Sequence, residues 1–383
     1  MSQPKLHTTV LIIPTGIGAA IGGYAGDALP VARMLAQVTD RLITHPNVMN
    51  GAQMYWPMPN AYYVEGYGLD QFAAGRWDLQ AVHQNPIGLV IDSAVEDDLR
   101  WRHLQAADAA RATLGLDIRA HVVTDRPLGV TLKTAESGAS WGTLENPGSL
   151  LRATERLINE GNVSAIAVIA RFPDDEGSTA LEAYRQGQGV DPLAGAEAVI
   201  SHLVVRTFKI PCAHAPALAP IALDPTISPR SAAEELGHTF LPCVLAGLSR
   251  APQFVEVRAD SVMDSSVIKA EQVDAVIVPA TAFGGSAVMS LAQARRLTSS
   301  SGPQIGPQII SVGENSTTMA VSASALGIPA IAVNTYLEAA GLIAAYRAGV
   351  APAALRPRMK PLGALGTLPD LAKSDERAQE TVF

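Results

Sequence analysis

The sequence predicts an α/β protein of Rossmann-like type, with mostly parallel sheets flanked by helices and with two lobes. Short runs rich in Val, Ile and Ala alternate with segments of helical periodicity along most of the 383 residues. Several of these runs are continuously apolar, which is typical of parallel strands that are buried on both faces. A composition of 48% hydrophobic and 17% charged residues supplies a large core, and the length suits two domains.

The elements follow one another in this alternating order. Strands are expected at 9–13, 42–44, 87–91, 118–123, 165–170, 254–257, 273–278, 308–312 and 330–333. Helices are expected at 29–42, 96–114, 150–159, 179–186, 194–207, 230–236, 287–297, 319–326 and 337–348. Prolines at 208–230 exclude a regular helix there, so this segment is either a crossover between domains or a structured binding loop.

The proline-rich segment suggests where the chain divides. We expect an N-terminal α/β lobe at 1–207 and a C-terminal α/β lobe at 208–350 that shares a cleft with the first. Residues 351–383 carry Pro, Gly and charges, and they are expected to form a surface-wrapping or flexible tail.

Charge and composition narrow the class of partner to a small-molecule ligand. The net charge is −8 and no basic stripe is present, which argues against nucleic acid and against anionic membrane surfaces. No apolar run reaches the roughly 18–20 residues of a membrane span, and two cysteines indicate reduced thiols in a cytoplasmic protein. The aromatic residues crowded into 52–78 are consistent with a lid, a satellite core or an oligomer contact, the last of which would make a homodimer.

A glycine-dense loop follows the first strand and precedes the first helix. Gly16, Gly18 and Gly22 leave backbone N–H groups open to a phosphate, carboxylate or amide ligand, unless they serve only tight packing. The dinucleotide fingerprint is incomplete, because Ile21 stands at its third glycine and Asp40 precedes the second strand instead of ending it. NAD(P) therefore stays open as a cofactor without being favoured.

Three more loops of small polar residues, at 134–142, 284–286 and 313–317, complete the predicted ligand site. Loops after parallel strands gather at one edge of a sheet, where ligands bind in such folds. The predicted ligand-binding residues in and near these loops are Asn50, Ser137, Ser140, Gly284, Gly285, Ser286, Asn315, Ser316 and Thr317. Helix capping by Asn315 or Ser316 is the structural alternative. A single composite site would place Gly18 and Glu314 on the same rim.

Three residues are the candidates for catalysis. His45 directly follows a strand, Glu314 could act as a general base or bind a ligand amine, and Cys212 could be a thiol activated by a nearby histidine. A zinc site made of Cys212, His214, His238 and Cys243 lacks the usual close cysteine pair, so no metal is favoured. Burial of the cysteines as small hydrophobic residues is the alternative.

Five segments resemble an uncharacterised family of cyanobacteria and plastid-bearing algae that is classified only as a domain of unknown function. They are I-I-P-T-G-I-G-A-A-I-G-G-Y-A-G-D-A (12–28), T-H-P-N-V-M-N-G-A (44–52), G-Q-G-V-D-P-L-A-G-A-E-A-V-I-S-H-L (187–203), I-P-C-A-H-A-P-A-L (210–218) and V-G-E-N-S-T-T-M (312–319). The resemblance covers nearly the whole chain and implies a cyanobacterial-type cytoplasmic protein. It carries no known activity and assigns no catalytic residue.

The residues themselves favour an enzyme that acts on a small anionic or amide-bearing metabolite by acid–base or nucleophilic chemistry. A hydrolase, lyase or isomerase is favoured over an oxidoreductase, because the dinucleotide fingerprint is incomplete. The G-x-S-x-G motif of Ser-His-Asp hydrolases is missing, so that route of hydrolysis has no support. An NAD(P)-dependent oxidoreductase and a non-catalytic metabolite-binding or assembly protein are the alternatives.

Overall fold

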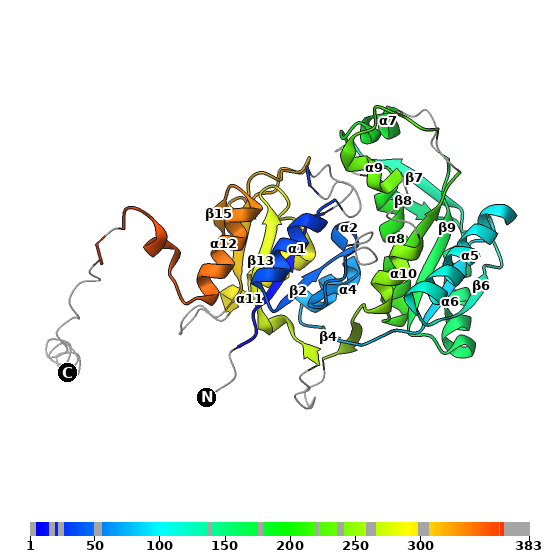
Figure 1. The fold of residues 1–383 in the computed structure, drawn as a ribbon, viewed down its shortest axis with the longest axis horizontal. Helices are drawn as coiled ribbons and strands as arrows, with labels where there is room; N and C mark the ends of the chain where they lie inside the picture. The colour runs from blue at the N-terminus through cyan, green and yellow to red at the C-terminus, as the bar shows by residue number, and fades with distance from the viewer. Residues whose placement is uncertain are drawn as a thin grey trace, which may run out of the picture. The chain divides into compact units, whose positions relative to one another are not determined.

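The α/β class is confirmed: two parallel sheets are flanked by helices (Figure 1). The structure, a computed structural model, describes residues 5–14, 20–21, 27–49, 56–136, 140–174, 179–219, 222–235, 241–257, 266–297, 306–359 and 361–363. Residues 1–344 form one compact unit and residues 345–383 a second. The elements that carry the candidate site belong to the first unit.

The larger sheet has six strands in the order β15-β14-β13-β1-β2-β3, and all neighbours pair in parallel. Its strands are β1 (Thr8–Leu11), β2 (Arg41–Thr44), β3 (Ala61–Tyr63), β13 (Val273–Pro279), β14 (Gln308–Val312) and β15 (Ile331–Val333). Blue N-terminal strands thus adjoin yellow and orange C-terminal ones in Figure 1. Both ends of the chain build this sheet.

The smaller parallel sheet has the order β10-β9-β5-β6. Its strands are β5 (Ile87–Ile91), β6 (Ile118–Val123), β9 (Ala165–Arg171) and β10 (Cys212–Ala217). Strand β10 lies inside the proline-rich segment, so that segment is neither a simple crossover nor a loop. Because β10 pairs with β9, and β1 pairs with β13, the expected division between residues 207 and 208 does not separate the two sheets.

Two small antiparallel sheets complete the strands. Strand β4 (Trp77–Gln80) pairs with β11 (Gln253–Glu256) and β12 (Val267–Ile268), along the two segments that lead from one large sheet to the other and back. Strands β7 (Val130–Thr134) and β8 (Ser140–Leu144) form a hairpin where the sequence predicts a loop at 134–142.

Helices cover both faces of each parallel sheet. The main ones are α1 (Leu29–Val38), α4 (Gly66–Ala73), α5 (Asp97–Leu114), α6 (Pro147–Gly161), α8 (Ala194–Phe208), α10 (Leu241–Ser249), α11 (Ser286–Leu297) and α12 (Tyr336–Arg347). Shorter ones are α2 (Pro46–Met49), α7 (Thr179–Arg185), α9 (Pro229–Glu235), η1 (Ala270–Gln272) and η2 (Pro352–Leu355). Within the described residues, no helix combines the length and the apolar character needed to cross a membrane.

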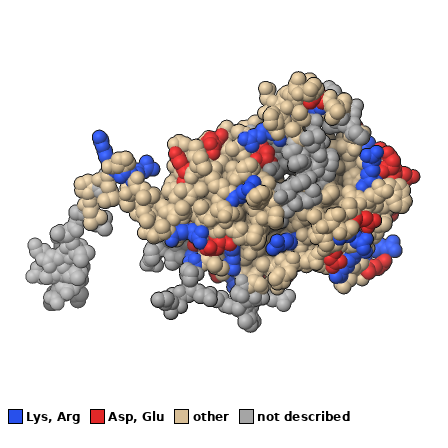
Figure 2. Space-filling model, in the orientation of Figure 1, with Lys and Arg blue, Asp and Glu red and all other residues tan. Residues whose placement is uncertain are grey.

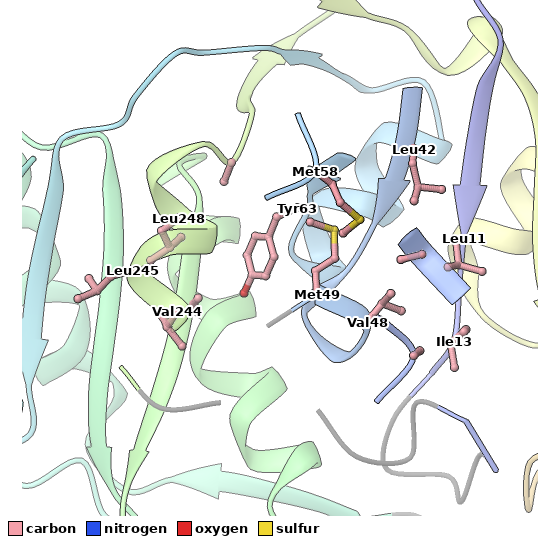
Figure 3. Close-up of a cluster of buried hydrophobic side chains, with 14 of the residues drawn as sticks. Leu11, Ile13, Leu42, Val48, Met49, Met58, Tyr63, Val244, Leu245 and Leu248 are labelled. Atoms are coloured by element: carbon pink, nitrogen blue, oxygen red, sulfur yellow. The ribbon is translucent and has the colours of Figure 1, made fainter. Parts of the chain in front are cut away.

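Alternating strand residues decide which helix packs on which face. In the six-stranded sheet, Leu11 faces α1 and α12, whereas Val10 faces α4 and α11. In the four-stranded sheet, α5 and α10 pack on one face, and α6 and α8 on the other. One hydrophobic cluster runs from α1 to α10, and Tyr63 lies in it between Leu248 of α10 and Met58 (Figure 3). The two sheets therefore share a core.

One predicted helix is wrong. Residues 319–326 form turns, and Val321 makes an isolated bridge to Ala282. The Ser322 hydroxyl accepts a hydrogen bond from the N–H of Ala325 and contacts Ser324 at 3.0 Å. Serine side chains that bond to nearby backbone groups compete with helix formation, which explains why the apolar spacing misled.

Candidate functional site

The strand order identifies the edge of the six-stranded sheet at which a ligand is expected. From β1 the chain continues through α1 to β2, and from β13 it continues through α11 to β14 on the opposite side. The two helices cover opposite faces, so the order reverses between β1 and β13. Open α/β sheets bind ligands beyond the carboxyl ends of the strands at such a reversal.

Asn315 joins the loops that follow β1 and β14 at this edge. Its amide oxygen accepts the N–H of Ile21 at 2.9 Å, and its amide nitrogen donates to the carbonyl of Ile21 and to the hydroxyl of Tyr336 at 2.8 Å. Asn315 is fully buried. Asn315 therefore connects the two loops, and none of its side-chain atoms is exposed to a ligand. The prediction that Gly18 and Glu314 share one rim stays a prediction, because Gly18 lies outside the described residues.

Acidic groups surround the hydroxyl of Tyr336. Burial raises its pKa, and the charges of Glu314 and Asp27 raise it further. Glu314 itself accepts the N–H of Tyr336 at 2.7 Å and so caps the first turn of α12. Asp27 lies 4.0 Å from the guanidinium of Arg230 on α9. Glu314 is exposed and has one carboxylate oxygen at the rim, so its predicted contact with a ligand remains a prediction.

His45 lies at this edge but serves the backbone. Its Nε2 accepts the N–H of Ile13 at 3.0 Å, while the Asn47 side chain donates to the carbonyl of Ile13 at 2.9 Å. Desolvation lowers the pKa of His45 to about 4, so the ring is neutral at physiological pH. The nitrogen lone pair that a general base needs is already used, which argues against the predicted catalytic role.

The loop 284–286 precedes a helix whose first turn is already capped. The side chain of Asp70 on α4 accepts the N–H of Ala287, and burial raises the pKa of that carboxyl. Thr317 is similarly engaged, because its N–H donates to the Thr281 hydroxyl at 2.7 Å. Ser316 is exposed and Gly285 has open space beside it. The predicted residues Gly16, Gly18, Gly22, Asn50 and Ser137 lie outside the described residues.

Ser140 is a structural residue. It belongs to strand β8, and its hydroxyl accepts the N–H of Gly195 at 3.3 Å. A Cβ on Gly195 would lie 2.3 Å from the Cα of Trp141, so the glycine lets the first turn of α8 approach the hairpin backbone. Ser140 therefore lies in a strand and not in the predicted loop, and its contact with a ligand stays a prediction.

The cysteines behave as buried hydrophobic residues. Cys212 is fully buried, and burial raises the pKa of its thiol. Burial likewise raises the pKa of Cys243 to about 11. A thiol that resists ionisation is a poor nucleophile, so the predicted catalytic role of Cys212 has no support. No group of three or more His, Cys, Asp or Glu residues suited to a metal occurs in the described part of the chain, which does not include His238.

The structure brings together a different polar cluster on α8 and β10. The hydroxyl of Ser201 lies 2.7 Å from Nδ1 of His214, and Nε2 of His214 lies 3.4 Å from a carboxylate oxygen of Glu197. Glu197 and Ser201 share one face of α8 because they are four residues apart. Ser201 and His214 are both buried, whereas Glu197 is half-buried. We call these three residues the α8 cluster.

Asp191 extends this cluster at the start of α8. Its carboxylate accepts the N–H of Leu193 at 2.8 Å, and it is almost fully buried. Burial raises the pKa of Asp191 to about 7, with a further contribution from the charge of Glu197. A carboxyl group whose pKa is raised by burial is a common component of acid–base sites.

Tyr63 reaches the same region from the end of β3. Its hydroxyl is buried and has no hydrogen-bond partner among the described residues. Burial raises its pKa, and the charges of Glu65 and Glu197 add to the effect, so the phenol remains a hydrogen-bond donor. Its ring packs beside Gly247 of α10. A buried donor without an acceptor is costly in a folded protein and often indicates function.

An ion pair next to Tyr63 links the six-stranded sheet to α8. A carboxylate oxygen of Glu65 lies 2.9 Å from Nε2 of His202, while its other oxygen caps α4. Burial lowers the pKa of His202, but the hydrogen bond and charge of Glu65 outweigh this effect and raise it above its ordinary value. The imidazole therefore favours its charged form.

The sequence contained a signal for the α8 cluster. Asp191, Glu197 and Ser201 lie within 187–203, and His214 lies within 210–218, both of which carry the family resemblance. The i,i+4 spacing of Glu197 and Ser201 on a predicted helix is also visible. The sequence did not predict strand β10, because Pro211 precedes it and Pro216 lies within it.

Comparisons with known proteins agree with the resemblance. The family described as "Protein of unknown function (DUF3326)" matches residues 8–356. An uncharacterised lipoprotein of Synechococcus sp. (strain ATCC 27144 / PCC 6301 / SAUG 1402/1) is 61% identical over 350 residues, which cover 91% of this chain and 93% of the relative. No solved structure matches the chain. The chain belongs to the DUF3326 family, which occurs in cyanobacteria.

Proposed function

We propose that this protein is an enzyme that carries out acid–base chemistry on a small amide-bearing metabolite, with the α8 cluster as its proton-transfer machinery. The observation that carries the proposal is His214, whose two ring nitrogens face Ser201 and Glu197. These contacts orient the imidazole, which is the requirement for directional proton transfer. Ser201 is too deeply buried within α8 to act as a nucleophile, so it is a positioning residue.

The charges near the α8 cluster favour a neutral ligand over an anion. The carboxylates of Glu197 and Glu65 would repel a carboxylate or phosphate ligand, whereas an amide ligand matches the hydrogen-bond donors and acceptors of these side chains. Its carbonyl can accept from the Tyr63 hydroxyl, and its N–H can donate to Glu197. Of the two ligand classes that the sequence predicts, anionic and amide-bearing metabolites, the charges near the α8 cluster favour the amide-bearing class.

Hydrolysis of the amide is the reaction that these side chains can support by proton transfer alone. Glu197 and His214 would take a proton from a water molecule as its oxygen bonds to the amide carbon. The C–N bond then breaks, and the same proton passes to the leaving nitrogen, which yields a carboxylic acid and an amine. Proton transfer by positioned groups contributes typically about 10²–10⁴-fold to a rate.

Turnover of a panel of primary amides, followed as ammonia release, tests the proposal. Glu197→Gln removes the charge while it keeps the shape, and we expect at least about a hundredfold loss of turnover with an unchanged melting temperature. Glu160→Gln is the matched control, because Glu160 is exposed and pairs with Arg156 on the surface. Equal turnover in wild type and Glu197→Gln would exclude the proposed role. Binding of an amide without ammonia release would favour a metabolite-binding protein.

The oxidoreductase alternative gains no support from the residues described. Asp40 accepts the N–H of His7 at 2.7 Å and so lies at the amino end of β2, away from the edge where a ribose would bind. A thermal shift with millimolar NAD(P) would revive this alternative.

The place of the protein in the cell is also a proposal. The composition favours the cytoplasm, whereas the Synechococcus relative is named a lipoprotein, which would suggest membrane attachment. Neither Cys212 nor Cys243 is accessible for a lipid, since both are buried. Fractionation of cells into soluble and membrane pools distinguishes the two.

A further inference from the structure

A cavity lies on the outer side of α1, where the segment before β3 passes over the helix. Its volume is about 520 Å³, within the range of small-molecule sites. Four residues of α1 and five consecutive residues of the following segment form its walls. The lining residues are Pro30, Arg33, Met34, Gln37, Trp56, Pro57, Met58, Pro59 and Asn60. None of them belongs to the α8 cluster.

Arg33 is the one cation among the residues that line this cavity, and two amide side chains, Gln37 and Asn60, accompany it. The guanidinium carbon of Arg33 lies 3.6 Å from the ring centroid of Trp56, which is the geometry of a stacked cation–π pair. No carboxylate among the described residues pairs with Arg33. By contrast, eight other arginines in the described part of the chain each form a salt bridge with an aspartate or glutamate. The sequence 50–55 that precedes Trp56 contains no acidic residue either.

One of the two amide side chains in the cavity is already bonded. The side-chain nitrogen of Asn60 donates to the carbonyl oxygens of Ala36 and Thr39, at 2.8 and 3.1 Å. The donors available to a ligand are therefore the amide of Gln37 and the guanidinium of Arg33, which stacks on Trp56 and is the only one of the two that carries a charge. A planar guanidinium presents parallel N–H donors that match a carboxylate in two-point contact.

We propose that this cavity binds a small planar organic anion, a carboxylate carried on a flat apolar body. The carboxylate bonds to the edge of the Arg33 guanidinium, and the apolar body lies against Met34, Pro57 and the indole of Trp56. Both parts of the ligand are needed, because a bare inorganic anion would leave the apolar walls wet and a neutral hydrocarbon would leave Arg33 unpaired. The site goes beyond the proposed amide chemistry and does not depend on it.

A matched pair of probes separates the two contributions. 2-Naphthoate carries the charge and the flat body, while 2-naphthamide has the same body without the charge. We expect saturable one-to-one binding of 2-naphthoate by titration calorimetry, with Arg33→Gln weakening it by about tenfold or more and changing 2-naphthamide little. Trp56→Ala should weaken both probes. Arg111→Gln on α5, an exposed arginine paired with Asp108, is the control and should change neither.

Three outcomes would overturn the proposal. They are equal affinity of 2-naphthoate for wild type and Arg33→Gln, equal affinity of the two probes for wild type, and no saturation at millimolar 2-naphthoate. Circular dichroism of each variant excludes unfolding as the cause of lost binding. Since Glu197→Gln lies outside this cavity, it should bind 2-naphthoate normally, so a failure of the amide proposal and a failure of this one are distinguishable.

Discussion

His45 and His214 both lie on or directly after parallel strands, yet the structure treats them differently. His45 accepts a backbone N–H from Ile13 and is held neutral by desolvation. His214 is buried too, but its ring nitrogens face two side chains, Ser201 and Glu197. The first histidine completes the fold of a loop, and the second is arranged as a proton carrier. A position at a strand end therefore indicates where chemistry is possible, whereas the partners of the side chain decide whether it occurs.

The same contrast extends to the regions around them. At the rim of the six-stranded sheet, Asn315 and Thr317 bond to their own chain, as does one oxygen of Glu314. Near the α8 cluster, by contrast, the Tyr63 hydroxyl has no partner within the described residues. Asp191 keeps a proton into the neutral range. The described polar side chains of the rim thus hold the fold together, whereas the Tyr63 hydroxyl and the Asp191 proton near α8 are available for chemistry.

The largest effect is expected from Gly195→Ala, which breaks the α8 side of the comparison. The new Cβ would meet the Cα of Trp141 at 2.3 Å and the carbonyl oxygen of Ser140 at 2.4 Å. Backbone atoms, unlike a side chain, cannot relieve the clash by changing rotamer, so we expect a loss of about 3 kcal/mol in the free energy of unfolding. Urea denaturation measures it. Gly341→Ala on α12, with nothing within 4 Å, should be neutral or stabilising. Equal stabilities of the two variants would contradict the close packing of α8 on β8.

Asn315→Ala tests the rim side of the comparison. The substitution removes the bonds to both backbone groups of Ile21 and to the hydroxyl of Tyr336. We expect about 2 kcal/mol of destabilisation in the same urea experiment, because the partners are left partly buried. Ser316→Ala, at the exposed neighbouring position, should change the stability by less than about 0.5 kcal/mol. If both variants behave alike, Asn315 is free to serve a ligand and the contrast fails.

The pH dependence of stability sharpens the comparison further. The folded pKa of Asp191 is raised to about 7, so its stabilising contribution is complete below the unfolded pKa and is lost as the pH rises through about 7. Between pH 5 and pH 8 this loss is on the order of 2 kcal/mol. Asp191→Asn keeps an acceptor for the cap of α8 and should remove most of that slope. Asp108→Asn on the surface is the control, and an unchanged slope in Asp191→Asn would place the titration elsewhere.

Charged side chains on the face shown in Figure 2 are interspersed in sign, in keeping with the absence of a basic stripe from the sequence. Surface charge of this kind shows little about mechanism. The cavity beside Arg33 is different, because its cation stacks on Trp56 and lies among apolar residues.

Local patterns in the sequence determined the α/β class, the core strands and several helix ends. Continuous apolar runs predict strands β5 and β9, and Gly115 ends α5 in the left-handed conformation, with φ of 69°. These features depend on neighbours in the chain, which periodicity and glycine content report directly. The connection between the loops after β1 and β14 was also predictable, since the ends of parallel strands share an edge.

Only the tertiary structure decided which polar groups remain available. The pairing of β10 with β9 carries His214 to Ser201, and the approach of β3 places Tyr63 near Glu197. Both arrangements join residues far apart in sequence, and both depend on burial, which no local pattern encodes. A side chain becomes chemically useful when packing removes its water without replacing the lost hydrogen bonds, and that balance is a property of the folded chain.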